Sequence, residues 1–325
     1  MTRKLIPAAL CALVLCGCGG KQTDTVALDA DTATAVSFEA DSAMQHLRAQ
    51  CDLGPRTPGS GAHRRCGDYL VAQFQARGCQ VTEQRAPLTM WDGKRFECRN
   101  ITAQYRPEAA ERIVLCTHYD SRPWADHDAD AANHTRPVLA ANDGASGPAV
   151  LLEVARKLAE LQPQVGVDFV CFDLEDYGAP QGSAGAPTDG SDWCAGSRYW
   201  AQHPIAEGYS PQFGVLLDMV GGRGARFARE YYSMQYAAPV VARVWSAAQT
   251  AGFASYFLNE MGGAVTDDHL SLNAVGIPTI DIIPGGSGEG FGPTWHTAQD
   301  TPDNIDPATL KAVGQTLLQM LADYR

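Results

Sequence analysis

Short apolar runs alternate with helical patterns between residues 113 and 321, and this alternation is the feature that most constrains the fold. The apolar runs predict buried strands, and the helical spacing of apolar residues predicts helices. A last helix begins at Asp306-Pro307, with aspartate as the cap and proline in the first turn. The pattern predicts an α/β sheet covered by helices on both faces. The predicted strands are 113–116, 167–172, 214–217 and 279–283, and the predicted helices are 146–161, 240–249 and the one from 306 through Leu321.

Acidic and imidazole side chains follow three of these predicted strands at the point where each strand ends. His118 comes just after the first strand, Glu175 and Asp176 follow the second, and Asp218 follows the third. Asp143 lies in the turn that opens the helix after the first strand. In open α/β sheets, ligands bind at the carboxyl ends of the strands. Three such placements predict a functional site at this edge of the sheet.

The residue types in these segments are suited to zinc, which binds imidazole and carboxylate groups. Asp143, Asp176 and His296 form a plausible set of three ligands, and three ligands leave one position open, as in catalytic zinc sites. Asp120 stands two residues after His118 and could orient that imidazole as a hydrogen-bonding partner. The sequence therefore predicts a zinc hydrolase-like centre.

Two of these segments also have interpretations without a metal. Asn142-Asp143-Gly144 is a turn sequence in its own right, and Asp173-Leu-Glu175-Asp176 could be a solvated acidic loop. Their occurrence together with the other segments favours the metal site. In the adjacent pair, Asp176 can bind the metal while Glu175 stays free to transfer protons, which requires a pKa near the working pH.

Taken in order, the motifs resemble those of the zinc exopeptidase superfamily of bacterial and animal aminopeptidases, and within it most of all the zinc-dependent glutaminyl cyclases. The resemblance extends from about residue 40 to the end of the chain and implies a single domain with a mixed, twisted central sheet. The motifs that carry it are His118-Tyr-Asp120, Asn142-Asp143-Gly-Ala-Ser-Gly147, Glu175-Asp176, Leu217-Asp218, Asp267-Asp-His269 and Trp295-His296-Thr.

The resemblance to the aminopeptidases implies a centre with two zinc ions. In those enzymes the residue that corresponds to Glu175 activates the water molecule that bridges the two ions. All of the metal positions hold competent ligands in this chain, so the two-zinc interpretation stays open. The implied ligands are His118, Asp143, Asp176, Asp218 and His296.

The resemblance to the cyclases implies a single zinc held by Asp143, Asp176 and His296. Glu175 then serves as the proton shuttle. Asp218 is no longer a metal ligand in this scheme and becomes a hydrogen-bonding partner of Asp267, which completes the set of catalytic residues.

Two features of the chain favour the cyclases. Asp267 stands where the aminopeptidases usually carry serine, and it supplies an additional carboxylate. Phe291 and Trp295 precede His296 at positions that resemble the walls of a pocket for the glutamine side chain, although either ring could also be an ordinary core or rim aromatic. Asp176 departs from the glutamate of animal cyclases, which favours a bacterial branch.

The segment 177–193 is rich in Gly, Pro and Ala and is long enough to cover the site. Within it, Trp193 is the candidate for contact with the substrate, and packing against the body of the protein is an equally good interpretation. The predicted substrate pocket therefore consists of Trp193, Phe291 and Trp295.

The N-terminus predicts export. Arg3 and Lys4 precede a short apolar run, as in a secretory signal, and Leu15-Cys-Gly-Cys18 resembles the signal box of bacterial lipoproteins. We therefore expect a signal peptide at 1–17, a lipidated Cys18 that begins a flexible tether at 18–38, and a catalytic domain at 39–325. The alternative is an ordinary exported protein. With Gly19 after the cysteine, a periplasm-facing lipoprotein of the outer membrane is expected, attached to the membrane through its lipid only.

The charge and the cysteines exclude some further functions. A net charge of −12 argues against nucleic acid as a ligand. Of ten cysteines, seven remain after Cys18, and none shows the Cys-x-x-Cys spacing of a structural zinc site. Cys116 and Cys171 lie in apolar runs and are expected in the core, whereas export would permit disulfides among the four cysteines of the N-terminal part.

The sequence thus predicts an enzyme that converts the N-terminal glutamine of peptides or exported proteins to pyroglutamate and releases ammonia. The alternatives are a two-zinc aminopeptidase that hydrolyses N-terminal residues, and a lipoprotein that binds peptides without turnover. The intact Glu175 and its neighbouring ligands count against the last of these.

Overall fold

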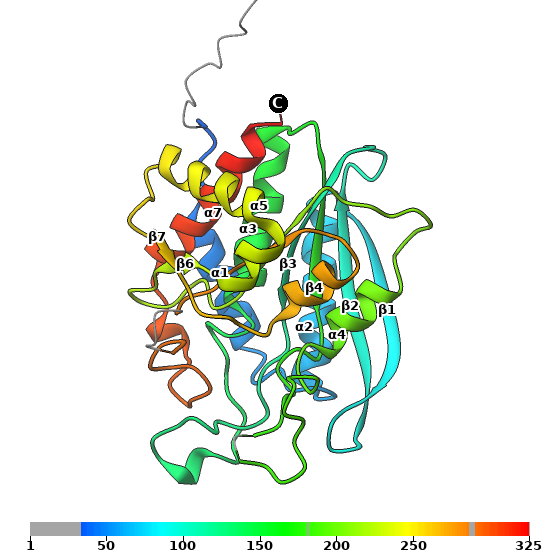
Figure 1. Ribbon diagram of the computed structural model, residues 1–325, viewed down its shortest axis with the longest axis vertical. Coiled ribbons are helices and arrows are strands. Elements are labelled where there is room, and N and C mark those ends of the chain that lie inside the picture. The colour runs from blue at the N-terminus through cyan, green and yellow to red at the C-terminus, as the bar shows by residue number, and fades with distance from the viewer. Residues whose placement is uncertain (1–33, 181, 286–289, 325) are drawn as a thin grey trace, which may run out of the picture. The chain divides into compact units, whose positions relative to one another are not determined.

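The computed structural model of the chain describes residues 34–180, 182–285 and 290–324 (Figure 1). The predicted signal peptide and the predicted lipid anchor at Cys18 lie outside these residues and stay predictions. Residues 34–38, the last part of the predicted tether, pack on the folded body. Phe38 is buried, and its backbone N–H donates a hydrogen bond of 2.8 Å to Gln315 Oε1. The apolar side chains of Val36 and Phe38 account for this difference from a tether.

The central sheet contains β1 (Gln80–Thr89), β2 (Arg95–Tyr105), β3 (Arg112–His118), β4 (Gly166–Phe172), β5 (Gly214–Leu217) and β8 (Thr279–Ile282). These strands lie in the order β1-β2-β4-β3-β5-β8. The long hairpin of β1 and β2, cyan in Figure 1, is antiparallel, and β2 also pairs antiparallel with β4. The strands β4, β3, β5 and β8 run parallel, so their carboxyl ends meet at one edge. The mixed sheet implied by the family resemblance is confirmed.

Seven α-helices and a small second sheet accompany the central sheet in the described part of the chain. The second sheet pairs β6 (Phe227–Arg229) with β7 (Phe257–Met261). Short 3₁₀ turns occur at Ala131–Asn133 and Pro302–Asn304. The helices are α1 (Ala40–Cys51), α2 (Gly61–Ala76), α3 (Ser146–Leu161), α4 (Ala195–Gln202), α5 (Tyr231–Thr250), α6 (Asp268–Ala274) and α7 (Pro307–Ala322).

Helices cover both faces of the central sheet. Successive residues of a strand point to opposite faces, so neighbouring residues of β3 show which helices pack on each face. On β3, Leu115 belongs to the main hydrophobic core, to which α1, α2, α3, α5 and α7 contribute. Its neighbours Val114 and Cys116 belong to a smaller core, which contains Trp200 of α4 and Leu272 of α6. The predicted α/β fold with helices on both faces is therefore confirmed.

The strands and helices predicted from the sequence are present. The bounds of α3 and β5 are those predicted, and α7 begins after Asp306, whose carboxylate accepts a hydrogen bond of 2.9 Å from the N–H of Ala308. The helix predicted at 240–249 is the second part of the longer α5. A kink at Ala237, two residues before Pro239, divides this helix, as expected because proline disturbs the helical hydrogen bonds before it.

All cysteines from Cys51 to Cys194 are buried and free, so the disulfides that export would permit are not formed among them. Cys116 and Cys171 lie in the cores, as predicted. Among the helices of the described residues, none combines the length and the apolar character needed to cross a membrane.

Candidate metal centre

The carboxyl ends of three parallel strands bring acidic and imidazole groups into contact. His118 is the last residue of β3, Asp218 directly follows β5, and Glu175 comes shortly after β4. His118 Nε2 lies 3.1 Å from Asp218 Oδ1, and His118 Nδ1 lies 3.8 Å from Glu175 Oε2. All three side chains are buried. The parallel register thus gathers at one edge the groups that the sequence distributes over a hundred residues.

Asp143 lies in a loop whose backbone is fixed by its neighbours. The N–H groups of Asn142 and Asp143 donate hydrogen bonds of 2.7 and 3.0 Å to the carboxylate of Asp300. Gly144 has a φ of +109°, and a Cβ there would lie 2.2 Å from the carbonyl oxygen of Asp120, so the position requires glycine. The Asn-Asp-Gly turn and the metal-site interpretation are compatible, because the turn presents the Asp143 carboxylate to its neighbours.

Asp143, Asp176 and His296 form a first group of potential ligands, called here the His296 set. His296 Nε2 lies 3.4 Å from Asp143 Oδ2 and 3.2 Å from Asp176 Oδ1. Bonds of about 2.0–2.1 Å to a tetrahedral zinc would place ligand atoms about 3.3–3.4 Å apart. Asp176 Oδ2 is buried without a hydrogen-bond partner, which is expected for a group whose partner is a metal ion. The set fits zinc.

His118, Asp143 and Asp218 form a second group, called here the His118 set. His118 Nε2 lies 3.2 Å from Asp143 Oδ1 and 3.1 Å from Asp218 Oδ1. Asp143 belongs to both sets and faces each with a different oxygen atom. The structure therefore offers ligand atoms for two ions, with Asp143 between them.

Glu175 is buried beside both sets and is no member of either. Burial raises the pKa of its carboxyl well above the ordinary value, repulsion from Asp176 and Asp267 acts in the same direction, and attraction to His118 opposes it. The thiol of Cys194 donates a hydrogen bond of 3.4 Å to Glu175 Oε1. A buried carboxyl with a raised pKa is suited to exchanging protons near neutral pH.

Asp120 holds the backbone of the acidic loop. Its two carboxylate oxygens each accept a hydrogen bond of 3.2 Å, from the N–H of Glu175 and from the N–H of Asp176. Its Oδ1 also faces His118 Nδ1 at 3.6 Å. The predicted contact with His118 is thus present at ion-pair distance, and the closer contacts of Asp120 fix the two residues that carry the predicted chemistry.

Asp218 of the His118 set belongs to a cluster of buried carboxyl groups with Asp267 and Asp268. Burial, followed by repulsion between neighbouring carboxylates, raises the pKa of Asp218 to about 6, that of Asp267 to about 7 and that of Asp268 to about 8. Asp218 Oδ1 is paired with His118, whereas Asp267 Oδ2 is buried without a hydrogen-bond partner. Asp218 and Asp267 line the same pocket, and repulsion from Asp218 contributes to the raised pKa of Asp267; the hydrogen bond between them that the cyclase resemblance implies stays a prediction.

Aromatic rings form part of the wall of a small pocket at this site. Trp193, Phe291 and Trp295 line a cavity of about 260 Å³ together with members of both ligand sets and with Glu175 and Asp267. The Phe291 and Trp295 rings lie 4.8 Å apart between centroids, and the Trp295 ring stacks on that of His296 at 3.9 Å. Trp193 lines the pocket and also packs on Arg122 of the body, so the packing interpretation is confirmed and contact with the substrate stays a prediction.

Several residues of the site, or their immediate neighbours, have left-handed backbone conformations. Leu174, Cys194, Met219 and His296 have φ values of 56°, 57°, 50° and 52°. Each such conformation costs about 1–3 kcal/mol in a residue other than glycine. Strain of this kind is common at functional sites, where the surrounding structure imposes it. The sequence does not reveal these left-handed conformations, because none of the four residue types favours a positive φ.

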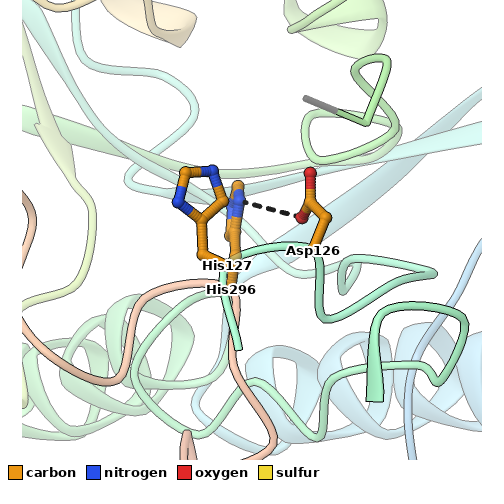
Figure 2. A group of neighbouring side chains, drawn as sticks. All are labelled: Asp126, His127 and His296. Atoms are coloured by element: carbon orange, nitrogen blue, oxygen red, sulfur yellow. Dashed lines mark ion pairs between the residues drawn. The ribbon is translucent and has the colours of Figure 1, made fainter. Parts of the chain in front are cut away.

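Three residues of the site were missed by the sequence analysis: Arg122, Asp126 and Asp300. Asp126 faces the imidazole of the potential ligand His296 (Figure 2), with Oδ1 3.7 Å from Nδ1. Asp126 lies in an irregular loop among other acidic residues, and nothing in its spacing distinguishes it from them. Asp300 follows the Trp-His motif closely, and that position was the only available signal.

A comparison with protein families decides to which group the chain belongs. The model of peptidase family M28 matches residues 100–321. The chain belongs to peptidase family M28. The match includes every member of the two ligand sets, and this zinc-dependent family implies zinc.

Solved structures similar to this M28 chain include two from Bacteroides thetaiotaomicron. A glutaminyl cyclase bound to N-acetylhistamine is 47% identical, with a TM-score of 0.87, over 89% of this chain and 99% of that one. A leucine aminopeptidase precursor is 46% identical, with a TM-score of 0.87, over 90% and 100%. The glutaminyl-peptide cyclotransferase of Bos taurus is 25% identical over 296 residues, which cover 83% of this chain and 78% of the relative. The zinc exopeptidase-like fold of the glutaminyl cyclases is therefore confirmed.

Proposed function

We propose that this M28 chain is a zinc-dependent glutaminyl-peptide cyclotransferase that converts N-terminal glutamine to pyroglutamate and releases ammonia. The observation that carries the proposal is the position of Asp267, which places an additional carboxyl group in the pocket beside Glu175 and the His296 set. The similarity to a bacterial glutaminyl cyclase and to the bovine cyclotransferase supports the same activity.

The pocket suits a small polar side chain. Its volume of about 260 Å³ lies below the range of about 300–1,000 Å³ found for pockets that bind drug-sized ligands. Trp193, Phe291 and Trp295 offer flat apolar walls for the methylene groups of glutamine. The carboxyl groups that line the pocket can bind the amide and the α-amine. A site of this shape can hold the side chain folded back towards its own amine.

The reaction needs a proton carrier and a means of polarising the side-chain amide. Zinc, when bound, supplies Lewis-acid polarisation of the amide carbonyl. The substrate's α-amine nitrogen forms a bond to the carbonyl carbon, and the bond from this carbon to the amide nitrogen breaks. Glu175 takes a proton from the amine and delivers it to the leaving ammonia. The ring closure is intramolecular, so holding the two groups together is the main contribution of the protein.

Asp218 and Asp267 act in this proposal as a pair that orients the transferring groups. Burial raises both pKa values, to about 6 for Asp218 and about 7 for Asp267; repulsion from Asp143 adds to the effect at Asp218, and repulsion from Asp218 adds to it at Asp267. Near neutral pH such a pair tends to share one proton, because two neighbouring buried carboxylates repel each other. One member can then donate a hydrogen bond while the other accepts one from the substrate's amine. In this role Asp218 belongs to the acid pair, and a single zinc occupies the His296 set.

The second candidate is a two-zinc aminopeptidase. The observation that favours it is the His118 set, whose ligand atoms are spaced as closely as those of the His296 set. Similarity to a leucine aminopeptidase precursor supports it as well. In an aminopeptidase, the Glu175 carboxylate would take a proton from water instead of from the substrate's amine.

A peptide assay distinguishes the two activities. The purified protein is offered, in separate reactions, peptides that differ only in N-terminal glutamine or leucine, and the products are identified by mass spectrometry. The proposal predicts loss of ammonia from the glutamine peptide and an intact leucine peptide. Release of free leucine without formation of pyroglutamate would refute the cyclase and support the aminopeptidase.

We also propose that the protein is exported as a lipoprotein with its lipid on Cys18. The proposal is supported by the signal-like sequence before this cysteine. Labelling with radioactive palmitate should mark the native chain and not a Cys18→Ser variant. Equal labelling of both would rule out Cys18 as the acceptor.

A further inference from the structure

A buried ion pair next to the metal ligands has no role in the chemistry described so far. Arg122 donates two hydrogen bonds of 2.7 Å to the carboxylate of Asp126, one from Nε and one from Nη2. The side chains are only 1% and 7% exposed. Moving both charges out of water is costly, so such a pair is weak evidence for added stability. Its contacts indicate what else it does.

Asp126 faces the side of the His296 ring that is turned away from the ligand set. His296 Nε2 faces Asp143 and Asp176, whereas its Nδ1 faces Asp126 Oδ1 at 3.7 Å (Figure 2). Nδ1 is buried and has no hydrogen-bond partner. A carboxylate in this position favours the tautomer that carries its proton on Nδ1 and leaves Nε2 free for the metal. Asp126 is therefore placed to orient the ligand.

His127 completes a group with Asp126 and His296 whose ligand atoms lie within 4.8 Å of one another. This group is a poor candidate for another metal site. Both oxygens of Asp126 accept hydrogen bonds from Arg122, and His127 is exposed and lies against the Trp295 ring at 4.2 Å. A cation here would have to compete with a guanidinium that is already paired, so an orienting role fits the group better.

Arg122 contacts a second metal ligand with its remaining nitrogen. Its Nη1 lies 3.4 Å from both the carbonyl oxygen and Oδ1 of Asp176. The same nitrogen donates a hydrogen bond of 3.2 Å to the carbonyl oxygen of Gly178. The guanidinium of Arg122 thus contacts Asp176, Asp126 and the backbone of Gly178.

Arg122 also lies against an aromatic wall of the pocket. Its guanidinium carbon is 4.7 Å from the centre of the Trp193 ring. The same ring packs closely on Gly178, where a Cβ would lie 2.1 Å from the indole. Trp193 and His296 are nearly parallel, at 5.9 Å between centroids and 10° between planes. Arg122 therefore touches a ligand of the metal and the wall that would contact the substrate.

We propose that Arg122 and Asp126 are positioning residues that couple zinc binding at the His296 set to the placement of Trp193 in the pocket wall. Zinc binding then orders Trp193, and an ordered Trp193 strengthens zinc binding, because coupling between two sites is reciprocal. The inference rests on zinc binding by the His296 set and not on the reaction catalysed. Its measurements need no turnover, so they can fail independently of the cyclase proposal.

The first test measures zinc affinity by competition with a chelator in Asp126→Asn and Arg122→Lys variants of the full chain. The first substitution keeps the shape of the side chain without its charge, and the second keeps the charge without the planar fork. Both substitutions are expected to weaken zinc binding by about tenfold or more, and the absorption bands of bound cobalt should shift. Unchanged affinity and unchanged cobalt spectra in both folded variants would overturn the proposal.

Arg112→Lys is a matched control. Arg112 donates a hydrogen bond of 2.9 Å from Nε to the buried Asp168, and a second one from Nη2. This pair lies at the opposite end of β3 from His118. The control should lose stability as Arg122→Lys does and keep the zinc affinity of the native chain. An equal loss of affinity in the control would show that general destabilisation causes the effect and would overturn the positioning role.

The second test requires no substitution in its main comparison. Hydrogen exchange of the backbone amides of residues 190–200 is measured in the native protein with and without zinc. The proposal predicts slower exchange with zinc bound, and a smaller zinc-dependent difference in Arg122→Lys. If zinc leaves the exchange of these amides in the native protein unchanged, the coupling does not exist, whether or not the variants fold.

Discussion

The His296 set and the His118 set use the same kinds of ligand and share Asp143, yet their surroundings differ. The His296 set borders the aromatic pocket, and its imidazole faces Asp126. The His118 set borders Glu175, and its own Asp218 belongs to a carboxyl cluster with Asp267. The comparison teaches that ligand spacing alone does not define the number of metal ions. The role of Asp218 matters as much. In an aminopeptidase it would bind a second metal ion, whereas in a cyclase it would form the acid pair with Asp267.

The largest expected effect is a difference in zinc content and activity between substitutions of His296 and of His118. His296→Gln should remove tightly bound zinc and reduce cyclisation to the level of buffer, since the His296 set loses its only imidazole. His118→Gln should retain one zinc per chain, because the His296 set stays complete. Zinc content by atomic absorption and pyroglutamate formation are measured in both. Loss of all zinc from the His118 variant would show that the sets are not independent.

The next effect concerns Glu175, the proposed proton carrier beside the two sets. Glu175→Gln should lower kcat by about a thousandfold, since general acid–base catalysis contributes about 10²–10⁴, and should retain its zinc. Glu160→Gln, at an exposed position on α3, is a control without expected effect. Loss of metal in Glu175→Gln would mean that the roles of Glu175 and Asp176 are reversed.

A smaller effect is expected at the carboxyl that distinguishes the two activities. Asp267→Ser removes the acid pair and introduces the residue usual in the aminopeptidases. We expect cyclisation to fall by about a hundredfold and Asp218 to become available to a second zinc. The measurements are kcat for the glutamine peptide and the zinc content. Full cyclase activity in this variant would remove the observation that carries the proposed function.

The smallest effect concerns stability beside the His118 set. Burial raises the pKa of Asp268 to about 8 from an ordinary value of 3.8. Between these values the folded state binds more protons than the unfolded state, so this group causes stability to fall as pH rises. Asp268→Asn should therefore show a flatter decrease in the free energy of unfolding between pH 5 and pH 8. Urea denaturation at several pH values measures the difference, and parallel curves for the two proteins would contradict it.

The sequence was sufficient for the parallel part of the sheet and for grouping the residues of both ligand sets at one edge. Apolar runs such as 113–116 and 167–172 became β3 and β4, because a buried strand needs little more than continuous apolar character. His118, Glu175 and Asp218 could be placed at one edge because parallel strands end together. These inferences depend on periodicity and chain order, which the sequence displays directly.

The residues that orient the site could not be predicted in the same way. Asp126 and Asp300 act from irregular loops, and their contacts with His296 and the Asp143 loop join parts of the chain more than 150 residues apart. Arg122 could not be told from a surface arginine, because its burial results from the path of several loops. The boundary at residue 39 was too late because Phe38 docks beside α7, a contact that local composition does not reveal.

The most direct test of the account is a titration of metal-free protein with zinc while the formation of pyroglutamate is followed. A single zinc in the His296 set, with Asp218 kept for the acid pair, predicts that cyclisation rises linearly and reaches its maximum at one equivalent per chain. A maximum that requires a second equivalent, accompanied by release of free leucine from the leucine peptide, would contradict the account and assign both sets to metal.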